Sequence, residues 1–278
     1  MINNKLQLCY LDGLFICSYI KNLEAFCAKP DATLLKLFVP CYLKNTDNMD
    51  SKHTWVIVCL TVICTGYSQA QSINHPNYAL KSHETLEISK VDITEQKTVI
   101  YLNIENKIAG GYFCADKNIF ILYPDGTKSN LISSKGIPVC PDTYKFKTIG
   151  EKLEFELTFS NVKKNTGWID LIEDCSDNCF SFYGICLDTD LNKKIEDAVH
   201  FAEIGEPAKA TLDFIAIANA INARNTGIGG LIYMNIIQLS KETGNIAKAS
   251  EWYGKLKSSD IPRRELYIKH LNSQGIIY

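Results

Sequence analysis

The chain has 278 residues, of which 46% are hydrophobic and 22% charged, a composition typical of globular proteins rather than disordered or fibrous ones. Its formal net charge is -2, and from Gln71 onward 23 basic residues stand against 26 acidic ones without long runs of one sign. This balance argues against a polyanion-binding surface, so no nucleic-acid partner is expected.

An export signal is predicted to begin at Met49. Lys52 lies in a short basic segment, an apolar run covers residues 55–66, and small residues precede an expected cleavage between Ala70 and Gln71. A membrane-spanning helix needs roughly 20 apolar residues, and this run is shorter. We therefore favour a cleaved signal peptide over a membrane anchor, and we expect contact with a membrane only during export.

Residues 1–48 show no convincing element of fold, and a signal peptide has to lead the nascent chain. We therefore expect translation to start at Met49, with residues 1–48 outside the native protein. Cys59 and Cys64 follow bulky residues where a lipidation site has small ones, so no lipid anchor is predicted. The expected organisation is a signal peptide at 49–70, a linker at 71–84, a β domain at 85–188 and a helical domain at 189–278.

The β domain is predicted from short runs rich in β-branched and aromatic residues. Its clearest strand is Lys152–Ser160, where apolar and polar residues alternate. The other predicted strands are Leu86–Ile93, Thr98–Glu105, Gly111–Ala115, Asn118–Tyr123, Ser129–Ser133, Trp168–Ile172 and Phe180–Leu187. Pro124, Asp125 and Gly126 predict a hairpin turn. This spacing favours an antiparallel, immunoglobulin-like two-sheet sandwich.

Five of the 11 cysteines follow Gln71, and an exported chain would meet an oxidising compartment. The preferred pairing joins Cys114 to Cys140 and Cys175 to Cys179, although sequence alone does not fix connectivity. Cys186 is then left over as a thiol candidate, with burial as its expected state. The destination is the periplasm, the cell surface or the medium.

Helices are predicted from about Asp188 to the end, because the hydrophobic period changes to nearly 3.6 residues. The predicted helices are 190–204, 207–223, 231–243 and 246–257, followed by one that Pro262 opens. Gly227–Gly230 is glycine-rich, but it follows a helix rather than a strand. We therefore interpret it as a flexible connector and not as a phosphate-binding loop.

The segment Gly230–Pro262 resembles a tetratricopeptide repeat, a helical hairpin of the kind that stacks into solenoids. The residues that match the repeat are Tyr233, Ile236, Gly244, Ala249, Tyr253 and Pro262, whereas Ile237 and Ser240 depart from it. The resemblance covers one repeat, with a divergent second unit possible in the preceding helix pair. It implies an all-α region whose groove binds another protein.

The chain also resembles uncharacterised exported proteins of Gram-negative bacteria that combine a small β-sandwich with a helical C-terminal part. The residues that carry this resemblance are Thr85 to Ile88 with Val91, Ser134 to Pro138 and Phe180 to Gly184. It implies an exported location and a two-part architecture, and it supplies no activity.

No motif with a spacing dictated by a catalytic mechanism is present, so no catalytic, cofactor-binding or metal-ligating residue is assigned. The acidic loop from Glu173 to Cys179 could offer oxygen ligands to calcium, but a solvated loop closed by a disulfide is the favoured interpretation. A row of aromatic residues could suit sugar rings, although core packing explains most of them. These residues are Tyr112, Phe113, Tyr123, Trp168, Phe180, Phe182 and Tyr183.

The sequence therefore predicts an α+β protein that is exported and non-catalytic, and that binds an unknown protein partner through its helical domain. The alternative is an enzyme or carbohydrate-binding protein of the cell envelope, with its site between the two domains. The oligomeric state stays open.

Overall fold

The computed structural model describes residues 9–11, 14–16 and 70–278, except 164, 177 and 222. The chain divides into two compact units, Met1–Ser68 and Gln69–Tyr278. In the first unit, β1 (Cys9–Leu11) pairs antiparallel with β2 (Leu14–Ile16), where the sequence indicated no element of fold. The predicted signal peptide lies outside the described residues up to its last residue, Ala70.

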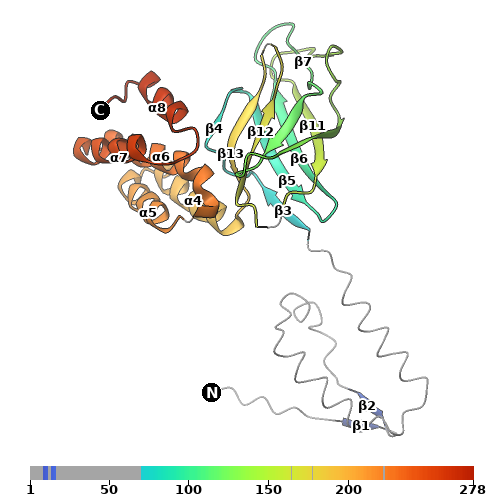
Figure 1. Ribbon diagram of the computed structural model, residues 1–278, viewed down its shortest axis with the longest axis horizontal. Coiled ribbons are helices and arrows are strands. Elements are labelled where there is room, and N and C mark those ends of the chain that lie inside the picture. Colours follow the sequence, from blue (N-terminus) through green and yellow to red (C-terminus); the bar gives the residue numbers. More distant parts are fainter. Residues whose placement is uncertain (1–8, 12–13, 17–69, 164, 177, 222) are drawn as a thin grey trace. The chain divides into compact units, whose positions relative to one another are not determined.

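Nine strands form one antiparallel sheet in the order β3-β5-β6-β11-β9-β8-β12-β13-β4 (Figure 1). They are β3 (Gln71–Asn74), β4 (Leu80–Lys81), β5 (Leu86–Ile93), β6 (Lys97–Glu105), β8 (Ile119–Leu122), β9 (Lys128–Lys135), β11 (Lys152–Ser160), β12 (Trp168–Glu173) and β13 (Ser181–Cys186). Two further short strands, β7 (Tyr112–Phe113) and β10 (Tyr144–Lys145), pair with each other. The structure thus confirms an antiparallel β region followed by helices.

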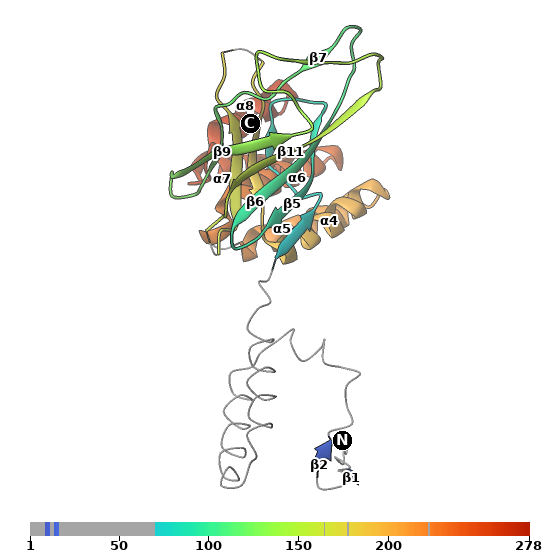
Figure 2. The same ribbon diagram turned by 90° about the vertical axis from the view of Figure 1, so that its right-hand side faces the viewer.

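The sheet is curled, and the connection between its two edge strands shows why. A flat sheet of nine strands would separate its edges by about 38 Å. Yet β3 ends at Asn74 and β4 begins at Leu80, a stretch of chain that reaches at most about 20 Å. The two edges are therefore brought near one another, and the sheet encloses a core (Figure 2).

Alternation decides which side chains enter this core. In β11, Leu153, Phe155, Leu157 and Phe159 are buried, as the sequence predicted. They share one apolar cluster with side chains from the far half of the sheet, such as Ile121 on β8. In β12 and β13 nearly every residue is buried, because the outer face of these two strands is covered as well.

Residues 71–84, expected to form a linker, instead supply both edge strands. Between β3 and β4 the backbone is also tied to the rest of the unit. The carbonyl of Asn77 accepts from the amide of Cys186 at 2.8 Å, and the amide of Asn77 donates to the side chain of Asn192 at 2.7 Å. The sequence pattern missed these strands because each is too short to show alternation.

Five α-helices follow the sheet in the described chain, at bounds close to those predicted. They are α4 (Thr189–Glu203), α5 (Pro207–Ala220), α6 (Gly229–Glu242), α7 (Ile246–Ser258) and α8 (Arg264–Ser273), with a 3-10 segment η3 (Ala223–Ile228) before α6. Asp188 caps α4 by accepting from the amide of Leu191 at 3.0 Å. Gly205 and Gly244 end α4 and α6 with φ of 83° and 74°, values that glycine adopts without strain.

The helices pack in chain order, each against the next, and α8 also contacts α6. The segment η3 lies against β12 and β13, and α4 contacts β13. A second apolar cluster joins the helices to this side of the sheet and includes Cys186 on β13 and Phe214 on α5. The β and helical parts are therefore packed together in one compact unit.

Candidate functional site

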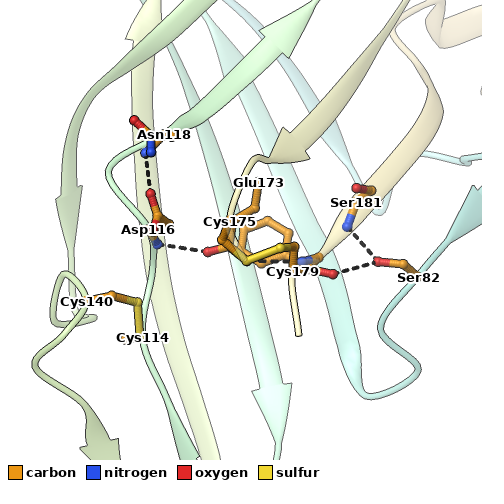
Figure 3. The surroundings of a disulfide bond; sticks show 10 residues. Ser82, Cys114, Asp116, Asn118, Cys140, Glu173, Cys175, Cys179 and Ser181 are labelled. Carbon is orange, nitrogen blue, oxygen red and sulfur yellow. Dashed lines mark hydrogen bonds between the residues drawn. A yellow bond between two sulfur atoms is a disulfide. The ribbon is translucent and has the colours of Figure 1, made fainter. Parts of the chain in front are cut away.

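Two disulfides join cysteines of the described second unit, and they are the pairs preferred from the sequence. Cys114 is bonded to Cys140 with Cα atoms 5.4 Å apart, and Cys175 to Cys179 with Cα atoms 5.6 Å apart (Figure 3). Cys186 belongs to neither pair. It is buried, and its Sγ lies 3.6 Å from the carbonyl oxygen of Asp188.

The loop closed by the second disulfide is held by the carboxylate of Glu173. One Glu173 oxygen accepts from the amide of Asp116 at 2.8 Å, and the other from the amide of Phe180 at 3.0 Å (Figure 3). Burial raises the pKa of Glu173, while these two hydrogen bonds oppose that rise. Both oxygens are thus engaged by the backbone, and Glu173 acts as a brace for the loop.

Other kinds of site were also considered from the sequence, namely a metal site, a membrane span and a sugar-binding face. In the described ranges, no three His, Cys, Asp or Glu side chains are grouped as metal ligands would be. Within the same ranges, no helix has the length and hydrophobicity required to cross a bilayer. Of the aromatic residues considered for sugar binding, Phe180 and Phe182 are wholly buried and Tyr112 is exposed.

A buried ion pair joins the sheet to the last helix. Asp170 on β12 has no exposed surface, and its carboxylate pairs with the guanidinium of Arg263, the residue before α8. The same carboxylate accepts from the amide of Gly184 at 2.7 Å. The guanidinium also lies over the rings of Tyr183 and Trp168, at 4.9 and 5.9 Å. We call Trp168, Asp170, Tyr183 and Arg263 the junction cluster.

Arg263 has a backbone φ of 60°, in the left-handed region that costs a non-glycine residue about 1 kcal/mol or more. The ion pair with Asp170 accounts for this conformation being kept. Burial lowers the pKa of Arg263, and burial also raises the pKa of the neighbouring Tyr267 to about 12. The sequence placed the start of the last helix at Pro262 and gave no sign of this turn.

Glycines allow the helices to reach the junction cluster. A Cβ on Gly227 would lie 2.0 Å from the ring of Trp168, and one on Gly230 would lie 2.2 Å from the ring of Tyr267. Gly227–Gly230 is therefore not the flexible connector that the sequence suggested. Gly227 and Gly230 are packed positions where a side chain has no room.

A groove of about 690 Å³ lies between α4 and α5. Its residues come from the two facing helix surfaces and from the turns at one end. They are Asp188, Asp190, Leu191, Lys194, Asp197, Phe201, Asp213, Ala216, Ile217, Ala220, Ile221 and Asn225. We call this feature the α4–α5 groove.

The α4–α5 groove has an apolar floor and an acidic rim. Leu191 and Ile217 are buried in the floor, whereas Asp190 and Asp197 on α4 are exposed along the edge and Asp213 on α5 is half-buried. Its described lining contains four aspartates and one lysine. Asp197 also pairs with Lys193 at 3.2 Å, and both side chains are exposed. The net charge of the lining is negative, which attracts cationic groups.

Asn225 lies at the end of the groove where α4 begins. Its side chain is 5% exposed and donates to the carboxylate of Asp188 at 3.0 Å. Its Oδ1 atom accepts no hydrogen bond from any described residue, although a buried amide oxygen normally has a partner. This end of the groove therefore keeps an unused acceptor.

Sequence reasoning located the helical region but found neither the junction cluster nor the α4–α5 groove. Asp170 and Arg263 are far apart in the chain, so no local pattern links them. The groove carries a usable signal, since the segment 188–221 holds seven acidic residues and three basic ones. A charge count for each helix pair reveals this acidic excess, although it does not show that a groove is present.

No known protein family matches the chain, and no curated protein matches it either. Function is therefore inferred from the geometry and charge of the structure.

Proposed function

We propose that this is an exported, non-catalytic binding protein, and that the α4–α5 groove holds a cationic, amphipathic segment of a protein partner. The single observation that carries the proposal is the groove's combination of an apolar floor with an acidic rim. An amphipathic segment would place its apolar side chains against Leu191 and Ile217 and its lysines or arginines near Asp190, Asp197 and Asp213.

The two parts of the groove would do different things. Burial of one leucine-sized or isoleucine-sized side chain contributes about 1.5–3 kcal/mol, whereas an exposed ion pair contributes about 0–1 kcal/mol. The floor would therefore supply most of the affinity. The aspartates would select for positive charge and accelerate association.

The exported setting is supported by the two disulfides, because such bonds persist in oxidising compartments and are rare in reducing ones. The envelope enzyme or carbohydrate-binding protein considered above needs polar groups that converge in an open space between the β and helical parts. At the junction cluster, Asp170 and Arg263 are instead paired with each other. This favours the binding protein.

We also propose that α4 with α5, and α6 with α7, are two hairpins of the tetratricopeptide type, and that the curled sheet is related to an immunoglobulin-like sandwich. Support for the hairpins comes from the glycine turns at Gly205 and Gly244 and from helix packing in chain order. Support for the sandwich comes from the single core shared by both halves of the sheet.

The test uses the full purified chain and a fluorescent amphipathic helical peptide with leucines on one face and lysines on the other. We expect saturable binding by anisotropy, and we expect Asp197→Lys combined with Asp213→Lys to weaken it by about tenfold or more. Glu95→Lys combined with Glu154→Lys makes the same charge change at exposed positions of the sheet and should leave affinity within about twofold at moderate salt.

A second peptide, with glutamates in place of the lysines, should not bind. The proposal fails if the lysine peptide does not bind, or if the two pairs of substitutions weaken it equally. In the latter case the peptide responds to total charge and not to the groove.

A further inference from the structure

The two ends of the helical region carry opposite charge. The segment 188–221, which contains α4 and α5, has seven acidic and three basic residues, whereas 246–278, which contains α7 and α8, has three acidic and six basic ones. The helix α6 lies between these pairs and contacts α5 on one side and α7 on the other. Figure 1 shows α4 and α5 at one end of the helical region and α8 at the other.

Both ends also expose large apolar side chains. At the acidic end, Ile204 and Leu212 are 53% and 62% exposed, and at the basic end, Ile246 and Ile277 are 51% and 69% exposed. Arrays of helical hairpins normally end in a polar outer face that keeps them soluble. These side chains provide apolar area at both ends that a contact between molecules would bury.

The outer face of α7 suits close contact. Ser250, Gly254 and Ser258 follow one another at helical spacing, and with Tyr253, Lys257 and Tyr278 they line a shallow hollow of about 340 Å³. A Cβ on Gly254 would meet no atom of the described chain within 4 Å, so packing inside this molecule does not require a glycine there. A glycine inside a helix is less favourable than alanine, and close approach by a neighbour would explain its presence.

We infer that the partner of the α4–α5 groove is the α7–α8 end of a second copy of this chain. This inference rests on the proposed function of the groove. The acidic rim with Asp197 and Asp213 would face Lys255 and Lys257, and the apolar floor would receive side chains such as Ile277. The contact joins two different surfaces, so it is head-to-tail, and repetition of it builds a ring or an open chain.

The experiment begins with the full-length chain in light scattering after size exclusion and in sedimentation velocity. The weight-average mass should rise with protein concentration at low salt and fall as salt is added, because the contact depends on exposed charges. Two double variants should each remain monomeric under the same conditions. The groove variant is Asp197→Lys with Asp213→Lys, and the tail variant is Lys255→Glu with Lys257→Glu.

Mixing the two variants gives the decisive result. Each variant alone has two ends of like charge, so its copies repel one another. In an equimolar mixture, each contact between a groove variant and a tail variant pairs opposite charges, so association should return. Lys145→Glu combined with Lys147→Glu changes exposed lysines of the β region and should associate like the unmodified chain. All three double variants place charges at exposed or half-buried positions, and circular dichroism verifies that each is folded.

The inference is overturned if the unmodified chain stays monomeric at every concentration, or if the mixture does not recover association. Binding of the lysine peptide distinguishes failure of the self-association from failure of the proposed function. If the peptide binds the groove while the chain stays monomeric, the groove serves another protein and only the self-association is wrong. If the peptide does not bind either, both proposals fall.

Discussion

The junction cluster and the α4–α5 groove contain similar groups, yet the chain treats them differently. Each combines aspartate with aromatic and apolar side chains. At the junction, the charge of Asp170 is matched within the chain by Arg263 and the space is filled by Trp168. In the groove, aspartates border open space above an apolar floor. The comparison suggests that the junction serves stability and that the groove serves binding.

The largest effect is expected from Arg263→Ala, which leaves the carboxylate of Asp170 buried without its cation. Breaking a buried ion pair typically costs about 3–5 kcal/mol. We expect a loss of that size in the free energy of unfolding, measured by urea denaturation at pH 7. The comparison predicts a much smaller change for Asp213→Ala in the groove, within about 0.5 kcal/mol.

Arg264→Ala is the matched control, because Arg264 is the next residue, is partly exposed, pairs with its neighbour Glu265 and donates to the carbonyl of Ser259 at 2.8 Å. It should cost about 1–2 kcal/mol, less than the loss expected for Arg263→Ala. Equal losses for the two arginines would show that the ion pair with Asp170 is not what stabilises the junction. A large loss for Asp213→Ala would remove the contrast between the two regions.

An intermediate effect is expected from Gly227→Ala. The added methyl group would lie 2.0 Å from the ring of Trp168, and overpacking of this kind costs about 1–3 kcal/mol. Gly254→Ala adds the same methyl group at an open position of α7 and should stabilise the isolated molecule by about 0.5–1 kcal/mol. Thermal unfolding at low protein concentration compares the two. Opposite signs support a tightly packed junction, whereas a neutral Gly227→Ala would contradict it.

The smallest effect concerns the hydroxyl of Tyr267, beside the junction cluster. The pKa of Tyr267 is raised to about 12 in the folded state by burial, while an unfolded tyrosine has a pKa near 10. A group whose folded pKa is raised contributes stability below the unfolded pKa, and that stability is lost as pH rises through the folded pKa. Between pH 10 and 12 the unmodified chain should therefore lose stability relative to Tyr267→Phe.

At about pH 11, the unmodified chain should have lost on the order of 1 kcal/mol of unfolding free energy relative to Tyr267→Phe. At pH 7, Tyr267→Phe should be neutral or slightly stabilising, because the Tyr267 hydroxyl has no hydrogen-bond partner among the described residues. Urea titrations of both proteins at pH 7 and 11 make the measurement. Parallel pH dependence would show that Tyr267 titrates normally.

Much of the fold could be predicted from local patterns. The alternation in β11 and the period change at Asp188 are properties of neighbouring residues, and the structure follows both. The edge strands β3 and β4 escaped prediction because two to four residues cannot show a period. The predicted flexible connector was wrong because a glycine required for space and a glycine required for flexibility look the same in a sequence.

The candidate surfaces were harder to predict than the fold. The ion pair between Asp170 and Arg263 depends on how the last helix returns to β12, which no local pattern encodes. The α4–α5 groove depends on the pairing of two helix faces. Only its charge was visible in the sequence, and charge alone does not separate a solvated surface from a binding groove.

The stretch 71–81 has a consequence for solubility, because it supplies the short edge strands on both sides of the sheet. Proteolytic removal of this stretch would expose the main-chain hydrogen-bond donors and acceptors of both β5 and β13. Unprotected rims of this kind recruit strands from other chains and lead to aggregation. Residues 71–81 thus protect the whole molecule against irreversible precipitation.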